Sequence, residues 1–161
     1  MRKRSSALAV GVLVLGLLAA GCGGGGSSGG SGGDATAQQV DVKCKAANSK
    51  VAVQLLNTLR KAKPKSEQEE IHLEVTQWVP VLIAGAEAEL LAIESLEVPE
   101  GKQAEVKRIL DAYRQWMLKA RSRPFKVVVA NDVYKQAREL AKKYGLADCG
   151  EDPFEIMRHL E

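Results

Sequence analysis

The chain has 161 residues, of which 23 are lysine or arginine and 20 are aspartate or glutamate, giving a formal net charge of +3. Arg2, Lys3 and Arg4 carry that whole excess, so the chain beyond residue 21 is balanced in charge. Aromatic residues make up 4% of the sequence and do not alternate with basic residues in a run suited to stacking on bases. This composition argues against a basic nucleic-acid binder.

The first 21 residues have the zones of a secretory signal peptide. Arg2, Lys3 and Arg4 form a positive start, and residues 7–20 form an uncharged apolar run that Gly21 closes. That run is shorter than the ~20 apolar residues needed to cross a bilayer. We therefore expect a cleaved leader over residues 1–21 rather than a retained anchor helix.

The end of this leader, Ala19-Ala20-Gly21-Cys22 after Leu18, resembles the lipobox of bacterial lipoproteins. The resemblance implies lipidation of Cys22 before cleavage, with palmitate among the acyl chains. A cysteine is required at this position because a thiolate is the nucleophile that takes the lipid. Each buried CH₂ of such chains adds ~0.8 kcal/mol to membrane attachment. The resemblance therefore implies a protein anchored to the extracytoplasmic face of a cell membrane.

Residues 23–33 contain only glycine and serine, a composition that behaves as flexible coil because it cannot bury apolar surface. Together with residues 34–40 they predict a linker over 22–40 that begins at the lipidated cysteine. Its root-mean-square reach is about 25 Å. The remaining residues, 41–161, are enough for one folded domain.

Apolar residues of that domain recur every three or four positions, which predicts amphipathic helices. The first helix begins between Asp41 and Asn48 and ends near residue 62. The second opens at a capping box formed by Ser66 and Glu69 and continues almost to Pro99. The third covers about residues 100–121.

The fourth helix has a clear end and an open start. Gly145 fits the left-handed position that terminates helices. The start lies at Pro124 or, if the β-branched residues 127–129 are extended, at a cap on Asn131 or Asp132. We favour Pro124, and we expect Asp152 followed by proline to open one short final turn.

Four such helices with short links predict an all-α fold, a four-helix up-down-up-down bundle. In that topology the start of the first helix and the end of the fourth meet at one end, which brings Cys44 and Cys149 together. Outside the cytoplasm a leftover cysteine pair is most simply a disulfide, with two free thiols as the alternative.

A second resemblance covers most of the chain after the linker. The segment from Cys44 to Asn48, the mid-helix Pro80, Val98-Pro99 and residues 137–149 are similar to small helical lipoproteins of high-GC Gram-positive bacteria. Those proteins are largely uncharacterised. The resemblance implies a helical bundle and supplies no activity.

Candidate catalytic and metal-binding residues are few. Glu69-x-x-His72 has the spacing used in di-iron bundles, but such sites need that motif twice, and the only other histidine is His159. The serines outside the linker lack the context of a nucleophile. We expect no metal, no cofactor and no enzymatic activity.

Pro80 lies deep inside the second predicted helix and cannot donate to the carbonyl of Thr76, so we expect a kink there. One hypothesis is a small-ligand pocket at the kink, because bundle sites form between facing helices. The alternative is a bent helix around a filled core. The candidate pocket residues are Trp78, Pro80, Tyr113 and Trp116.

Basic residues gather at two of the predicted links, which the bundle topology places at the end far from the linker. This candidate basic pole suits an acidic cell-envelope polymer or an acidic protein. The alternative is that cations simply favour helix C-termini. The pole comprises Arg60, Lys61, Lys63, Lys65, Lys119, Arg121, Arg123 and Lys126.

The sequence thus favours a non-enzymatic, surface-displayed helical module that binds a partner or supports the envelope. A tethered small-molecule binder that uses the region of Trp78 and Pro80 comes second. An enzyme comes third.

Overall fold

The computed structural model describes residues 32–130 and 133–160, and all the secondary structure in those ranges is helical. The predicted all-α class is confirmed. The elements in chain order are α1 (Gly32–Ala62), α2 (Glu67–Leu73), the π-helical turn η1 (Glu74–Trp78), α3 (Val79–Glu94), α4 (Gln103–Ser122), α5 (Pro124–Val129), α6 (Lys135–Tyr144), the 3₁₀ turn η2 (Asp148–Gly150) and α7 (Pro153–His159).

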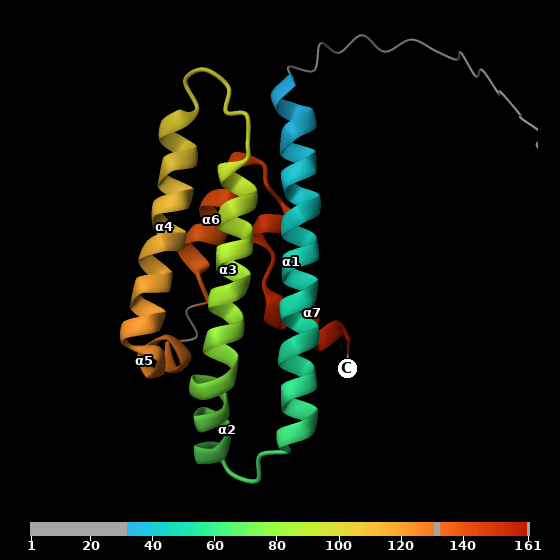
Figure 1. Ribbon diagram of the computed structural model, residues 1–161, viewed down its shortest axis with the longest axis vertical. Coiled ribbons are helices and arrows are strands. Elements are labelled where there is room, and N and C mark those ends of the chain that lie inside the picture. The colour runs from blue at the N-terminus through green and yellow to red at the C-terminus, as the bar shows by residue number, and fades with distance from the viewer. Residues whose placement is uncertain (1–31, 131–132, 161) are drawn as a thin grey trace, which may run out of the picture.

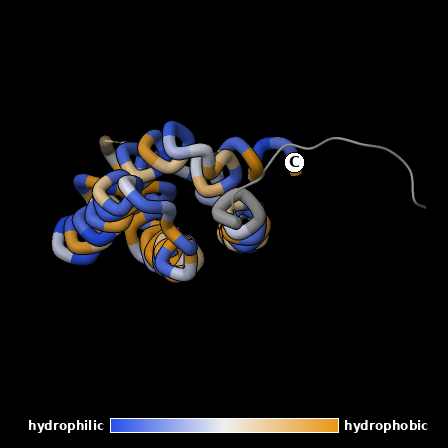
Figure 2. The backbone as a smooth tube through the Cα atoms, turned by 90° about the horizontal axis from the view of Figure 1, so that it is seen from above, coloured by the Kyte–Doolittle hydropathy of each residue, from blue (hydrophilic) through white to orange (hydrophobic). Residues whose placement is uncertain are grey.

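The long helices α1, α3 and α4 lie side by side and run in alternating directions (Figure 1). Helix α3 is in the middle and packs against both of the others. The C-terminal segments cover the back of this layer: α7 and η2 pack on α1, and α6 packs on α4. Seen from above, the long helices and the C-terminal segments form two rows (Figure 2).

The expected arrangement of four full-length helices is not confirmed, because shorter helices take the place of the fourth. A helix does begin at Pro124, but α5 ends at Val129 and α6 begins at Lys135. Tyr134, the residue before α6, has a φ of 35°, which no continuous right-handed helix contains. Its side chain is 1% exposed, so packing in the core holds the backbone in this conformation. The alternative caps, at positions 131 and 132, lie outside the described residues.

The predicted linker extends too far along the chain. Residues 34–40 belong to α1, which begins at Gly32, ahead of the expected start between Asp41 and Asn48. Val40 is 1% exposed and Ala37 packs against the core, so apolar burial draws this segment into the helix. The leader, Cys22 and the linker up to residue 31 lie outside the described residues.

The predicted capping signals at the other helix ends are confirmed. The Ser66 hydroxyl accepts a bond from the Glu69 N–H at 3.2 Å, and the Glu69 carboxylate accepts from the Lys65 N–H at 2.7 Å. Gly145 ends α6 with a φ of 108°, and the next N–H, of Leu146, donates to the Ala141 carbonyl at 3.0 Å. Asp152 caps α7.

A π-helical turn lies directly before Pro80, where we expected a kink. The Val79 N–H donates to the Glu74 carbonyl five residues back, so the wider turn accommodates a residue that has no N–H. Leu73 and Trp78 are both buried, five positions apart. Ile71 and Val75, which a regular spacing of three and four residues would put on the buried stripe, are only half-buried.

The segment Glu67–Glu94, which joins α2, η1 and α3, is long and apolar enough to span a membrane by length and composition. Half of its most apolar window is buried inside the fold. It approaches α1 closely at Gly85, where a Cβ atom would lie 2.5 Å from Cγ2 of Val51. The apolar character of this segment is that of the central core helix.

Candidate functional site

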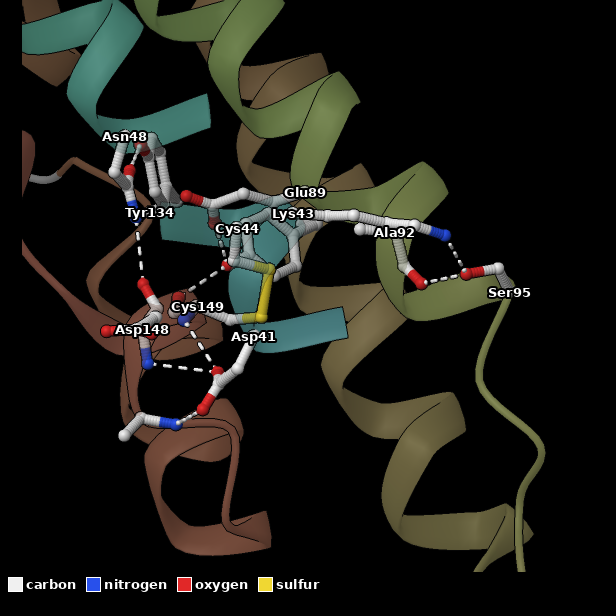
Figure 3. Close-up of a disulfide and its surroundings, with 12 residues drawn as sticks. Asp41, Lys43, Cys44, Asn48, Glu89, Ala92, Ser95, Tyr134, Asp148 and Cys149 are labelled. Carbon is white, nitrogen blue, oxygen red and sulfur yellow. Dashed lines mark hydrogen bonds between the residues drawn. A yellow bond between two sulfur atoms is a disulfide. The ribbon is translucent and has the colours of Figure 1, made fainter. Parts of the chain in front are cut away.

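Three residues on one face of α1 hold the η2 turn. The Asp41 carboxylate accepts from the N–H groups of Ala147 and Asp148 at 3.1 and 3.0 Å, and more weakly from that of Cys149 at 3.4 Å. One turn along, Cys44 forms a disulfide with Cys149, with an S–S distance of 2.04 Å. A further turn along, the Asn48 amide donates to the Asp148 carbonyl at 2.9 Å (Figure 3).

The same turn is held from the opposite side by α3 and α4. The Tyr113 hydroxyl of α4 lies 3.0 Å from the Cys149 carbonyl oxygen and is also hydrogen-bonded to the Glu89 carboxyl group of α3. Glu89 and Tyr113 are both 0% exposed. A polar cluster thus sits at the centre of the fold, where α1, α3, α4 and η2 meet.

Burial raises the pKa of Glu89 from its ordinary value of 4.5 to about 8. The bond to Tyr113, the positive charge of Arg138 and the nearby Asn48 amide lower this pKa but do not offset burial. Oε1 of Glu89 accepts no hydrogen bond of normal geometry from any described residue. Glu89 is therefore predominantly protonated at neutral pH.

A protonated Glu89 also explains the geometry around Tyr113. The phenol has one proton but lies beside two oxygens that accept when Glu89 is ionised. If Glu89 is protonated, its carboxyl O–H donates to the Tyr113 oxygen, and the phenol donates to the Cys149 carbonyl. Every close pair in the cluster then contains one donor and one acceptor.

Tyr134 closes the cluster on the side of α6. Its hydroxyl lies 3.4 Å from Oδ1 of Asn48, and its ring centroid is 5.6 Å from that of Tyr113. The Arg138 guanidinium lies 5.9 Å from the centroid of the Tyr134 ring and forms an ion pair with Asp152 at 2.9 Å. The tyrosines and Asn48 are buried, and the half-buried Arg138 and Asp152 are paired with each other, so the arrangement fixes the chain and does not present a reactive group to solvent.

The four candidate pocket residues do not line one site. Tyr113 and Trp116 meet at the Tyr134 ring, with the Trp116 and Tyr134 centroids 5.0 Å apart. Trp78 lies elsewhere, its ring centroid 5.6 Å from that of Phe154. Pro80 is exposed on the surface of α3.

A cavity of about 40 Å³ nevertheless lies beside Trp78. Its walls are mainly apolar and include Leu82, Val127 and Phe154. The Trp78 side chain is 5% exposed, and its Nε1–H has no hydrogen-bond partner among the described residues. Glu74 also lines the cavity, and burial together with the neighbouring Glu70 raises its pKa.

The candidate basic pole is present but partly neutralised. Its two halves lie at the C-terminal ends of α1 and α4, both toward the end of the layer opposite the start of α1 (Figure 1). Arg121 forms an ion pair with Glu87 of α3. The pole therefore offers less free positive charge than its eight residues suggest.

Glu69 and His72 are both exposed on α2, Glu69 in the first turn, where it takes part in the helix cap, and His72 in the last turn. Within residues 32–130 and 133–160, no group of three or more His, Cys, Asp or Glu side chains is placed to hold a metal ion.

Sequence reasoning missed the central cluster, although signals for it existed. Glu89 lies three residues after Ala86 and four before Ile93, which puts it on the apolar stripe of its helix. Asn48 lies one turn after Cys44. A polar residue on a buried stripe predicts a polar partner in the core.

The chain matches no family model, no curated protein and no solved structure. The lipobox and the resemblance to helical lipoproteins therefore stay predictions.

Removing the disulfide should destabilise the fold. The bridge closes a separation of 105 residues, and the chain-entropy model assigns about 4.7 kcal/mol to a loop of that size. We expect a lower melting temperature for the reduced protein and for Cys44→Ala/Cys149→Ala, measured by circular dichroism. An unchanged melting temperature, or two alkylatable thiols in the untreated protein, would contradict the bridge.

Glu89 should make the protein less stable as the pH rises. Its pKa is higher in the folded state than the ordinary value of 4.5, so between pH 4.5 and about 8 the folded state binds the extra proton. Stability then falls by up to about 1.4 kcal/mol per pH unit across that window. Glu89→Gln should remove this slope and gain stability over the wild type toward pH 8.

The exposed Glu139 supplies a matched control, since Glu139→Gln removes a carboxylate from the surface of α6. Urea unfolding between pH 5 and pH 8 measures the effect. Parallel stability curves for Glu89→Gln and the wild type would show that Glu89 is ionised throughout.

Proposed function

We propose that the protein is a lipid-anchored helical module on the extracytoplasmic face of a cell membrane, where it binds a partner or supports the envelope without enzymatic activity. The observation that carries this proposal is the disulfide between Cys44 and Cys149. Stable disulfides belong to oxidising compartments and are rare in the cytoplasm.

The lipobox supports the same location by independent chemistry. It requires export before Cys22 is lipidated, and the disulfide requires export before Cys44 and Cys149 are oxidised. The two signals lie in different parts of the chain and involve different cysteines, so their agreement is informative.

The charge distribution supports a partner on the side away from the membrane. The candidate basic pole lies toward the end of the long helices opposite the start of α1, so a tether at the N-terminus leaves it facing outward. An acidic envelope polymer or an acidic protein surface has the chemistry to dock there. Arg121 is already paired with Glu87, whereas Lys63 and Lys65 form no ion pair with another residue in the described part of the chain. These two lysines are therefore the better candidates for this contact.

A tethered small-molecule binder is the second candidate, and the cavity beside Trp78 is the observation that favours it. A volume of about 40 Å³ holds roughly three water molecules at ~10–15 Å³ each. Leaving a buried N–H unpaired costs about 1–3 kcal/mol, so the Trp78 Nε1–H favours an occupant that accepts a hydrogen bond. The cavity therefore suits a small, neutral, mainly apolar molecule with one oxygen.

Metabolic labelling tests the anchor. The full chain, expressed in bacteria fed radiolabelled palmitate, should incorporate the label, and Cys22→Ala should lose it. Cys44→Ala is the matched control and should keep the label, because its thiol lies in the folded domain. An unlabelled wild type, or a labelled Cys22→Ala variant, would contradict the proposal.

Tryptophan fluorescence tests the cavity. In a Trp116→Phe background the emission reports on Trp78 alone, and ethanol, propanol or acetone should give a saturable shift. Val128→Phe adds a ring to the cavity wall and should abolish that shift. No saturable response, or the same response with the cavity filled, would exclude this candidate.

A further inference from the structure

The outer surface of the α3–α4 pair carries two matching stripes of side chains. On α3 the stripe is Glu87, Leu91 and Glu94, and on α4 it is Arg114, Leu118 and Arg121. Both sets follow the spacing i, i+4 and i+7, which places each set on one face of its helix. Each stripe has a leucine between two charges, acidic on α3 and basic on α4.

Ion pairs join the two stripes at both ends. Arg121 is bonded to Glu87, and Nη2 of Arg114 lies 2.5 Å from Oε1 of Glu94. Arg114 also contacts Asp111 of its own helix at 3.4 Å. Because α3 and α4 are antiparallel, this register places Leu91 opposite Leu118 between the two bridges.

The leucines are among the most exposed large apolar side chains of the described residues, and each is 65% exposed. At that exposure, no described element covers either side chain. A paired apolar centre between ion pairs resembles the core and rim of a protein interface.

The charges indicate which partner fits. If a second copy faces the first across a two-fold axis parallel to the helices, α3 of each copy lies against α4 of the other. Glu87 then meets Arg121 of the second copy, Leu91 meets its Leu118, and Glu94 meets its Arg114. Each carboxylate would lie between two guanidinium groups, and the leucines would be covered. A surface that complements itself in this way is what an isologous dimer requires.

We infer that the α3–α4 face is a homodimer interface, with a second copy of this chain as the partner. This inference goes beyond the proposed function, because it involves neither the basic pole nor the cavity. It does agree with the proposed anchor. A two-fold axis parallel to the helices leaves both copies of the α1 start at the same end, so both tethers reach one membrane.

The area of the α3–α4 face sets the expected affinity of the dimer. Helix α3 has 16 residues, so it is about 24 Å long, and two helices are about 20 Å wide. The resulting area of about 500 Å² per partner is below the ~800 Å² of a standard interface. Such a dimer is weak in free solution, but confinement to a membrane raises the effective concentration of the partners.

Cysteine crosslinking in membranes tests the geometry. Leu91→Cys and Leu118→Cys chains with different epitope tags are co-expressed, and isolated membranes are oxidised. The predicted axis places position 91 against position 118, so the mixed disulfide should exceed either homodimeric disulfide by about fivefold or more. Glu139→Cys, on α6 at the back of the layer, is the control and should not crosslink. Equal yields for all pairs, or crosslinking only to another protein, would overturn the inference.

Charge reversal tests the complementarity. Each of Glu87→Arg/Glu94→Arg and Arg114→Glu/Arg121→Glu should lower the mixed crosslink by about tenfold, because like charges then face each other. Co-expressing the two variants, or combining all four changes in one chain, should restore the crosslink. A crosslink insensitive to all these changes would overturn the inference. Melting curves confirm that the variants fold, and palmitate labelling of the same samples reports separately on the anchor.

Discussion

The attachment of the η2 turn to α1 is the constraint on which the rest of the structure depends. Asp41, Cys44 and Asn48 hold that turn by three kinds of interaction: backbone N–H groups on a carboxylate, a covalent bond, and an amide on a carbonyl. The turn is also where Tyr113 makes contact from α4. The C-terminal third consists of short helices that would be only marginally stable alone. Its position on the long helices therefore depends on the contacts between α1 and the η2 turn.

Much of the fold was predictable because local chemistry determines where most helices end. Ser66, Gly145 and Asp152 act through bonds to residues within a few positions, and their predicted roles are confirmed. The fourth helix could not be predicted in the same way. Its interruption depends on Tyr134, whose left-handed backbone is held by rings from α4. Helix periodicity carries no information about contacts of that kind.

The central polar cluster was only partly predictable. The two cysteines could be paired from their count and from the topology. Glu89 could have been identified as a charge on an apolar stripe, but its partners could not, because Tyr113 and Asn48 come from other helices. The position of the Trp78 cavity likewise depends on α5 and α7 folding back against η1 and α3, which the pattern of a single helix does not show.

The π-helical turn before Pro80 determines the orientation of the whole of α3. A turn with one residue more than an α-helical turn rotates everything after it by about 100° relative to an uninterrupted helix. Glu89, Gly85 and the Glu87–Leu91–Glu94 stripe owe their orientation to that single extra residue. If the same residues formed a continuous α-helix without the wider turn, α3 would rotate and Glu89 would point away from Tyr113. The π-helical turn thus sets which side of α3 is interior and which is surface.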